Sequence, residues 1–241
     1  MIVKAVRYPV LLLDADGTLY DFEKSQAKAL EAAYHRAGFN GHTPYTPQIL
    51  ALYDSINQSW WRRLERGECS KQQLQLGRFR EFLEALGLQG SPEQFNDFYM
   101  DELGNGSYLL PHALEVCNEL AAACDLYIVT NGVSRTQHHR IGASPLAKLF
   151  RDIFVSEDAG APKPEPRYFQ YVFEKLKGIP KNQMLLVGDS LSSDMAGACG
   201  AGLDCCWLNS RQQPRPHDLP ITYEIQDLRE LPQIVFSSPT L

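Results

Sequence analysis

Two carboxylate side chains follow a short apolar run near the start of the chain. Residues Leu11–Leu13 lead directly to Asp14 and Asp16, and Gly17 and Thr18 come next. A turn after a buried strand lets both acids reach one site, and a glycine supplies the backbone freedom for such a turn. The same residues fit an Asx-type turn that only leaves the sheet. A calcium loop is a second alternative, but its glycine belongs at the sixth position and this one is the fourth.

A second pair of acids follows another apolar run. Residues 184–187 are apolar, and Asp189 and Asp194 come after them, before a helix rich in small residues. Taken alone, this pattern also fits a helix N-cap with an acid in its first turn. Together with Asp14 and Asp16, these acids can converge on one hard cation. Magnesium is indicated, because it is held by a few carboxylates plus waters and substrate oxygens.

Two further segments carry groups that suit an anion. Thr130, Asn131 and Gly132 end a third apolar run, and a hydroxyl, an amide and a backbone N–H at a helix start can cradle an anion. Lys163 lies between two prolines, which stiffen its loop and fix where the ammonium points. A strand-exit turn and a solvated surface lysine are the alternatives for these two segments.

These four motifs, in this order, resemble the haloacid dehalogenase superfamily of hydrolases over nearly the whole chain. The family pattern is Asp-x-Asp-x-Thr, then a strand ending in Thr or Ser, a lone lysine, and Gly-Asp-x-x-x-x-Asp, and each part is present. The resemblance implies a magnesium-dependent phosphomonoesterase. Asp14 would attack phosphorus to form a phosphoaspartate. Asp16 would protonate the leaving oxygen and then activate water.

The same resemblance implies roles for the other motif residues. Asp14, the backbone carbonyl of Asp16 and the side chain of Asp189 would hold Mg²⁺. Asp194 would orient metal-bound water or Lys163 from outside the ligand set. A separate set would hold the phosphoryl oxygens: Thr130, Asn131 and Lys163. Asp16 also distinguishes phosphatases from the dehalogenase branch, which lacks a second acid because a halide leaves without a proton.

The elements around these motifs alternate between strands and helices. Five continuous apolar runs suit strands that are buried on both faces of a parallel sheet. They are Pro9–Leu13, Leu126–Val129, Ile153–Val155, Met184–Val187 and Cys205–Leu208. Helix-length segments separate them: Pro111–Ala123, Ser134–Leu149 and Glu165–Lys177. This order predicts an α/β fold, a doubly wound parallel sheet. Near the end, Thr222–Ile225 is expected as an edge strand and Leu228–Val235 as a short helix.

A run of helices interrupts the alternation after the first strand. Four segments have capping residues or glycines at their ends: Ser25–Ala37, Thr46–Arg66, Ser70–Leu86 and Ser91–Glu102. We therefore predict a core domain over residues 1–19 and 107–241, with an inserted helical cap domain over 20–106. An insert at this point would sit over the carboxyl ends of the strands, where open α/β sheets bind ligands.

A narrower resemblance concerns the substrate. Trp60–Gly67, Gln73–Phe82 and Gly202–Asn209 look like the pyrimidine 5′-nucleotidase branch, which implies a nucleoside 5′-monophosphate as substrate. Aromatic residues of the cap could stack a base or pack the cap's own core. They are Phe22, Trp60, Trp61, Phe79 and Phe82. Val133 departs from that branch, which often carries a bulkier aromatic after Asn-Gly.

Composition narrows the function classes. The chain has 241 residues and a formal net charge of −6, which argues against a nucleic-acid polymer as partner. No apolar run is long enough for a signal peptide or a membrane helix, so we expect a cytoplasmic protein, a monomer or homodimer that binds a small phosphorylated substrate. The cysteines show no metal spacing and are expected as free thiols. Alternatives are a sugar-phosphate or phosphoglycolate phosphatase, a mutase, and a non-catalytic binding protein on the same scaffold.

Overall fold

The computed structural model describes residues 5–236, and the chain forms two compact units. One unit comprises the described residues up to Phe22 and from Ser107 onward, and the other comprises Glu23–Gly106. The ends of the predicted core domain, residues 1–4 and 237–241, lie outside the described residues. Within residues 5–236, none of the helices has the length and apolar character that crossing a bilayer requires.

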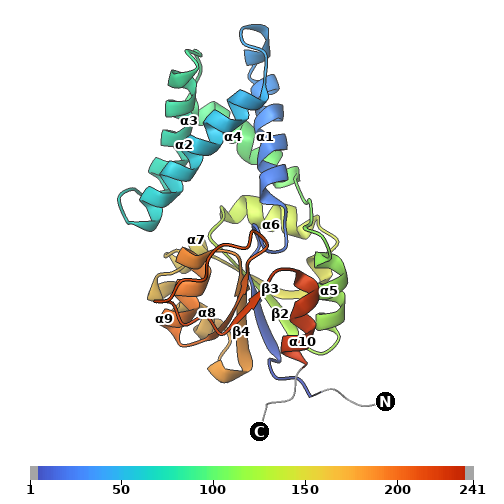
Figure 1. Cartoon of the computed structure of the whole chain (residues 1–241). Helices are drawn as coiled ribbons and strands as arrows, with labels where there is room; N and C mark the ends of the chain where they lie inside the picture. Colours follow the sequence, from blue (N-terminus) through green and yellow to red (C-terminus); the bar gives the residue numbers. More distant parts are fainter. Residues whose placement is uncertain (1–4, 237–241) are drawn as a thin grey trace. The chain divides into compact units, whose positions relative to one another are not determined.

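The first unit is built on one sheet of six parallel strands in the order β3-β2-β1-β4-β5-β6 (Figure 1). The strands are β1 (Val10–Leu13), β2 (Asp125–Thr130), β3 (Phe150–Val155), β4 (Met184–Gly188), β5 (Asp204–Leu208) and β6 (Tyr223–Ile225). All predicted strands are present, including the edge strand. The sheet confirms the predicted doubly wound α/β fold.

Both faces of this sheet are buried, as the continuous apolar runs indicate. In β1, Leu11 and Leu13 belong to one hydrophobic cluster, while Val10 and Leu12 belong to the cluster on the opposite face. Helices α5 (Ala113–Ala121), α6 (Ser134–Gly142) and α10 (Leu231–Val235) contribute to the first cluster, and α8 (Pro166–Lys175) and α9 (Ala196–Ala201) to the second (Figure 1). Alternate side chains of a strand point to opposite faces, so a strand covered on both sides is apolar throughout.

Helix α6 is shorter than the predicted helix, which extended to Leu149. It ends at Gly142, and a separate 3-10 turn, η2 (Ala147–Leu149), follows. Pro145 explains the break, because proline lacks the N–H that a helix needs and disfavours helical geometry at the residue before it. The predicted last helix is likewise a 3-10 turn followed by α10. The other short elements are α7 (Ser156–Ala159), η3 (Lys181–Gln183), η4 (Leu191–Met195) and η5 (Leu228–Glu230).

The second unit is helical. Its main elements are α1 (Phe22–Arg36), η1 (Phe39–Gly41), α2 (Pro47–Glu65), α3 (Lys71–Ala85) and α4 (Pro92–Asn105). Ser70 caps α3 by accepting from the Gln73 backbone N–H, and Ser91 caps α4 in the same way. These caps satisfy N–H groups that a helix start leaves without partners. The four predicted helices are therefore present, with ends that differ by a few residues.

The interior of the helical unit is aromatic. Its buried rings contact one another at centroid distances of 5.1–6.0 Å, and they belong to Tyr53, Phe79, Phe82, Phe95 and Tyr99. Phe79 and Phe82 thus pack this interior. The Trp60 ring lies over Gly77, where an added Cβ would come within 2.2 Å of it. Close helix packing therefore accounts for both the tryptophan and the glycine.

Candidate active site

Three neighbouring strands end in polar residues at one edge of the sheet. Asp14 directly follows β1, Thr130 closes β2, and Asp189 directly follows β4. Because the strands are parallel and β1 lies between β2 and β4, these residues meet at the carboxyl edge. The chain places β2 and β3 on one side of β1 and β4 on the other. Asp14 therefore stands at the topological switch point, where open α/β sheets bind ligands.

The Asp14 carboxylate is held through both of its oxygens. Asp14 is only 6% exposed. Its Oδ1 accepts a hydrogen bond from Lys163 Nζ at 2.7 Å, and its Oδ2 accepts one from Thr18 Oγ1 at 3.2 Å. These two contacts fix the plane of the carboxylate. Burial raises the pKa of Asp14 well above its ordinary value, although the Lys163 charge opposes that shift.

Lys163 connects three elements through one buried ammonium. Its Nζ donates to Asp14, to Asp194 Oδ1 at 2.6 Å and to the Val129 carbonyl at 2.8 Å, which uses all three of its N–H groups. Burial alone would lower the pKa of Lys163, but the two carboxylates outweigh burial and raise it above its ordinary value. Lys163 therefore carries a positive charge at neutral pH, directly beside the Asp14 oxygen.

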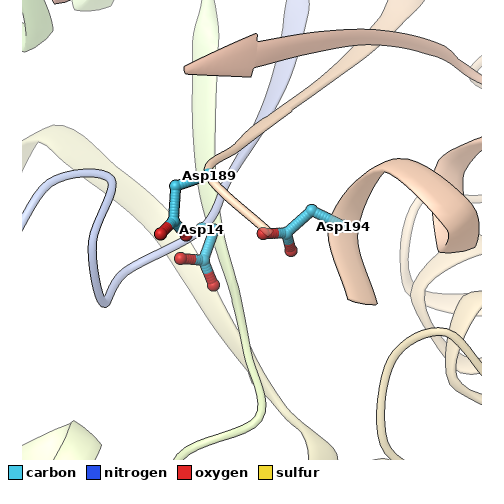
Figure 2. A group of neighbouring side chains, drawn as sticks. All are labelled: Asp14, Asp189 and Asp194. Carbon is cyan, nitrogen blue, oxygen red and sulfur yellow. The ribbon is translucent and has the colours of Figure 1, made fainter. Parts of the chain in front are cut away.

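Three carboxylates gather around this lysine. Figure 2 shows the side chains of Asp14, Asp189 and Asp194 pointing toward one another, and one oxygen from each lies within 4.8 Å of the others. The protein atoms around the Asp189 carboxylate and the charge of Asp194 raise the pKa of Asp189, although its side chain is exposed at the rim. One ammonium does not neutralise three clustered carboxylates. An all-oxygen donor set with this surplus of negative charge suits a hard divalent cation such as Mg²⁺.

Each motif glycine makes room for a side chain of the site. A Cβ on Gly17, whose φ is +87°, would lie 2.5 Å from Asp189 Oδ2. A Cβ on Gly188 would lie 2.4 Å from the Asp194 carboxyl carbon, and one on Gly132 would lie 2.0 Å from the side-chain nitrogen of Gln137. These contacts are far shorter than real Cβ contacts, so larger residues would displace the neighbouring groups.

Asp16, the second acid of the first motif, has its own partners on α6. Arg140 donates from Nη2 to Asp16 Oδ1, and Gln137 donates from Nε2 to Asp16 Oδ2 at 2.8 Å. The Asp16 side chain is 25% exposed, whereas that of Arg140 is 1% exposed. Asp14 and Asp16 are therefore held by different cations, and solvent reaches the second acid more readily.

Asn131 contacts the lysine loop rather than facing outward. Its side-chain carbonyl accepts from the Lys163 backbone N–H at 2.8 Å, and its amide donates to the Lys163 backbone carbonyl at 2.9 Å. This reciprocal pair ties the end of β2 to the loop between α7 and α8. The side chain that the sequence suggested for phosphate contact thus positions Lys163 in this structure.

The loop after β4 is anchored in the same manner. Trp207 of β5 donates its indole N–H to the Asp189 backbone carbonyl at 2.9 Å. Asp194, 1% exposed, accepts from the Ser190 backbone N–H at 3.1 Å as well as from Lys163. The backbone of Asp189 and the side chain of Asp194 are therefore held in place.

The structure brings the sequence-predicted residues to one edge of the sheet. These residues are Asp14, Asp16, Thr130, Asn131, Lys163, Asp189 and Asp194. Sequence reasoning assigned no role in the site to four residues that hold them: Thr18, Gln137, Arg140 and Trp207. The Thr18 position is part of the first motif. The spacing of three between Gln137 and Arg140 places both on one helix face, but only their burial distinguishes them from a surface pair.

Comparisons with known proteins match this chain to one hydrolase family. A family model described as haloacid dehalogenase-like hydrolase matches residues 8–202. A relative from Bacillus subtilis (strain 168), the HAD-hydrolase YfnB, which is named by its family alone, is 38% identical over 229 residues, covering 95% of this chain and 96% of YfnB. The pyrimidine 5′-nucleotidase YjjG of Escherichia coli (strain K12) is 27% identical, covering 95% of this chain and 99% of its own length.

A solved structure is similar over the same extent. The crystal structure of YfnB from Bacillus subtilis bound to magnesium superimposes with a TM-score of 0.88, covering 95% of this chain and 99% of that one. That structure is described as revealing interdomain movement.

Proposed function

This chain belongs to the haloacid dehalogenase-like hydrolases, and from that premise we propose that it is a phosphomonoesterase with Asp14 as its nucleophile. One observation carries the proposal. The buried Asp14 carboxylate contacts Lys163 at 2.7 Å within a cluster of two further acids at the switch point of the sheet. Such a site offers a nucleophile, a fixed cation and carboxylate oxygens that suit a second cation, all around one reacting group.

Mg²⁺ fits the donor atoms of the cluster. The side chains of Asp14 and Asp189 and the backbone carbonyl of Asp16 would hold it, and Asp194 would support it from outside that set. When bound, the ion would supply positive charge that offsets the repulsion between an anionic nucleophile and an anionic phosphate. A surplus of carboxylates around Lys163 supports this assignment, because the ammonium alone leaves them uncompensated.

In the first step, an Asp14 oxygen attacks phosphorus. Asp16, in its protonated form, donates its proton to the leaving oxygen as the phosphorus–oxygen bond breaks. Asp14 becomes a phosphoaspartate and the alcohol departs. The Thr130 hydroxyl would bind a phosphoryl oxygen, Lys163 would offset the phosphoryl charge from its place beside Asp14, and Asn131 would contribute by holding the Lys163 backbone.

In the second step, water attacks the phosphorus of the phosphoaspartate. Asp16, now a carboxylate, takes a proton from that water, the phosphorus–oxygen bond to Asp14 breaks, and inorganic phosphate leaves. Both aspartates return to their starting forms. Lys163 pairs with Asp14 and Arg140 pairs with Asp16, and these separate contacts suit the separate roles of nucleophile and acid–base residue.

We propose a nucleoside 5′-monophosphate, with a pyrimidine base, as the substrate. Two pyrimidine 5′-nucleotidases, YjjG and PynA of Streptococcus pneumoniae (strain ATCC BAA-255 / R6), are 27% and 28% identical over 95% and 93% of this chain. These similarities extend over both units and not only over the catalytic motifs. They support the nucleotide over a sugar phosphate or phosphoglycolate.

Asp14→Asn tests the proposed chemistry. Phosphate release from a nucleoside 5′-monophosphate in the presence of Mg²⁺ should fall below detection, because an amide cannot act as the nucleophile. A matched control is Asp152→Asn, which makes the same change at an exposed acid in β3 and should leave turnover intact. Full turnover by a clean Asp14→Asn preparation would contradict the mechanism.

A substrate panel tests the leaving group. Pyrimidine monophosphates should exceed sugar phosphates and phosphoglycolate in kcat/KM by at least about tenfold, or about 1.4 kcal/mol of transition-state discrimination. Higher kcat/KM values for sugar phosphates or phosphoglycolate would contradict the nucleotide as substrate but leave the phosphatase activity supported. Halide release from a 2-haloacid would indicate a dehalogenase, and transfer of the phosphoryl group to a second substrate would indicate a mutase; either result would contradict the phosphatase activity. No turnover of any phosphomonoester would favour a binding protein on this scaffold.

A further inference from the structure

We infer that Gln137 and Arg140 of α6 are positioning residues that orient Asp16 and the Thr130 hydroxyl for the proposed phosphoryl transfer. The inference rests on the proposed function and adds residues that none of the four sequence motifs contains. Gln137 is 2% exposed and Arg140 is 1% exposed. Charged and amide side chains are rarely buried so completely unless they are paired, so the partners of this pair decide its role.

Hydrogen bonds settle the orientation of the Gln137 amide. Arg140 Nε donates to Gln137 Oε1 at 2.6 Å, so this oxygen is the acceptor and the opposite atom is the NH₂ group. That NH₂ has two protons. One is donated to Asp16 Oδ2 and the other to Thr130 Oγ1, each at 2.8 Å. Gln137 therefore links the acid–base residue to the phosphate-binding residue through one rigid group.

Asp16 is held at both oxygens by this pair. Arg140 Nη2 reaches Oδ1, while Gln137 reaches Oδ2. The Arg140 guanidinium also lies over the Tyr20 ring, with its central carbon 5.0 Å from the ring centroid. Each carboxyl oxygen of Asp16 therefore has one buried donor, and together the two donors fix the plane of the carboxyl group.

Thr130 is oriented by what it accepts. Its Oγ1 receives the Gln137 amide proton and also the Gly132 backbone N–H at 3.1 Å. A hydroxyl has two lone pairs and one proton, so two accepted bonds leave that proton for a third group. A phosphoryl oxygen, which only accepts, is the matching partner. Gln137 thereby turns Thr130 into a donor toward the substrate.

Gly132, in the turn after Thr130, leaves the space that the Gln137 side chain occupies. An added Cβ would lie 2.0 Å from Gln137 Nε2 and 2.5 Å from the carbons Cγ and Cδ of the same side chain. No adjustment of a few tenths of an ångström relieves such an overlap. The glycine is therefore required by the amide that packs on it.

The test separates positioning of Asp16 from simple support of α6. A p-nitrophenyl leaving group departs without a proton, whereas the alcohol of a nucleoside monophosphate needs one. For Arg140→Met and Gln137→Met, we expect kcat/KM on the nucleoside monophosphate to fall about 100-fold, and on p-nitrophenyl phosphate by less than about fivefold. Arg140→Lys should recover part of the loss. Equal losses on both esters would indicate a structural role and overturn the inference.

A double-mutant comparison gives an independent reading. Asp16→Asn removes the group that Arg140 orients, so adding Arg140→Met to it should lower kcat/KM on the nucleoside monophosphate by no more than about twofold further. If the double variant instead loses kcat/KM by the product of the two single-variant losses, the inference is overturned. Arg151→Met is the matched control, since it removes an exposed guanidinium paired with Asp125 at the amino ends of β3 and β2 and should leave both esters unaffected.

Inhibition by inorganic phosphate tests the orientation of the Thr130 hydroxyl by Gln137. Gln137→Met should raise the inhibition constant of inorganic phosphate at least about threefold, while Arg140→Lys should leave it unchanged. An unchanged constant in Gln137→Met would overturn this role of Gln137. Gln137→Met removes no charge, so it can test the inference even if Arg140→Met fails to fold.

If the unaltered protein hydrolyses neither ester, the proposed function itself is wrong. That outcome is distinct from an active protein whose variants lose both esters equally.

Discussion

The two units of this protein bury positive charge in different ways. In the α/β unit, Lys163 contacts two carboxylates at 2.7 and 2.6 Å, and Arg140 pairs with Asp16. In the helical unit, Arg78 is 4% exposed and its contacts are neutral. Its Nη1 donates to Asn57 Oδ1 at 3.0 Å, its Nη2 lies 3.7 Å from a methionine sulfur, and its guanidinium carbon lies within 5.0 Å of two ring centroids.

This difference separates charge arranged for chemistry from charge arranged for packing. A buried cation beside acids leaves a polar cluster that a phosphate and a divalent ion can enter and balance. A buried guanidinium stacked on rings and bonded to an amide completes an interior instead. Asn57 in turn donates to Gln26 at 2.8 Å, and Gln26 donates to Asp54 at 2.6 Å, so two neutral amides stand between the arginine and the acid that ends this network.

The largest expected effect follows from removing the core cation. Lys163→Met leaves Asp14 and Asp194 buried without their partner, which should cost about 3–5 kcal/mol of unfolding free energy. Loss of a preorganised donor should also lower kcat/KM by about 10²–10³-fold. Thermal unfolding and phosphatase assays on the same preparation measure both. Wild-type stability and turnover would mean that this lysine has no part in the site.

A glycine-to-alanine substitution in each unit, with closely similar steric overlap, compares the effect of overpacking at the site with its effect in the helical unit. Gly188→Ala places a methyl 2.4 Å from the Asp194 carboxyl carbon, and Gly77→Ala places one 2.2 Å from the Trp60 ring. Both should lose about 1–3 kcal/mol of stability by overpacking. Only Gly188→Ala should also lower kcat, by about tenfold or more, since it displaces the acid that holds Lys163. Equal kcat values for the two variants would remove the distinction.

The smallest effect is expected at the cap cation. Arg78→Met fills similar space and removes a buried charge whose contacts within residues 5–236 are with neutral groups, but it leaves Asn57 Oδ1 without a donor. Removal of the buried charge is stabilising and the unsatisfied Asn57 oxygen is destabilising, so the unfolding free energy should change by no more than about 1 kcal/mol. A loss as large as that of Lys163→Met would show that Arg78 has an ionic partner.

The sequence was sufficient to predict the fold and the gathering of the acids. Continuous apolar runs ending in Asp14, Thr130 and Asp189 predict parallel strands, and parallel strands bring their carboxyl ends to one edge. Spacing alone also predicted helices at 134–149 and 228–235. There, Pro145 and the 3-10 turn η5 changed the outcome, since the apolar pattern does not record where backbone hydrogen bonds fail.

The supporting residues could not be predicted in the same way. Gln137 and Arg140 have the spacing and polarity of an ordinary solvated helix face, and only the tertiary position of α6 buries them. Asn131 illustrates the reverse problem. Its residue type and place suggested direct phosphate contact, whereas both ends of its amide bind the Lys163 backbone, a partner 32 residues away that no local pattern reveals.

Trapping the covalent intermediate tests the central claim most directly. The protein, mixed with Mg²⁺ and a nucleoside 5′-monophosphate and quenched in acid during turnover, is digested and analysed by mass spectrometry. The account predicts one added phosphoryl group on the peptide that contains Asp14, converted by borohydride to homoserine at that position, and none in Asp14→Asn. Rapid turnover with no adduct, or an adduct on another residue, would contradict it.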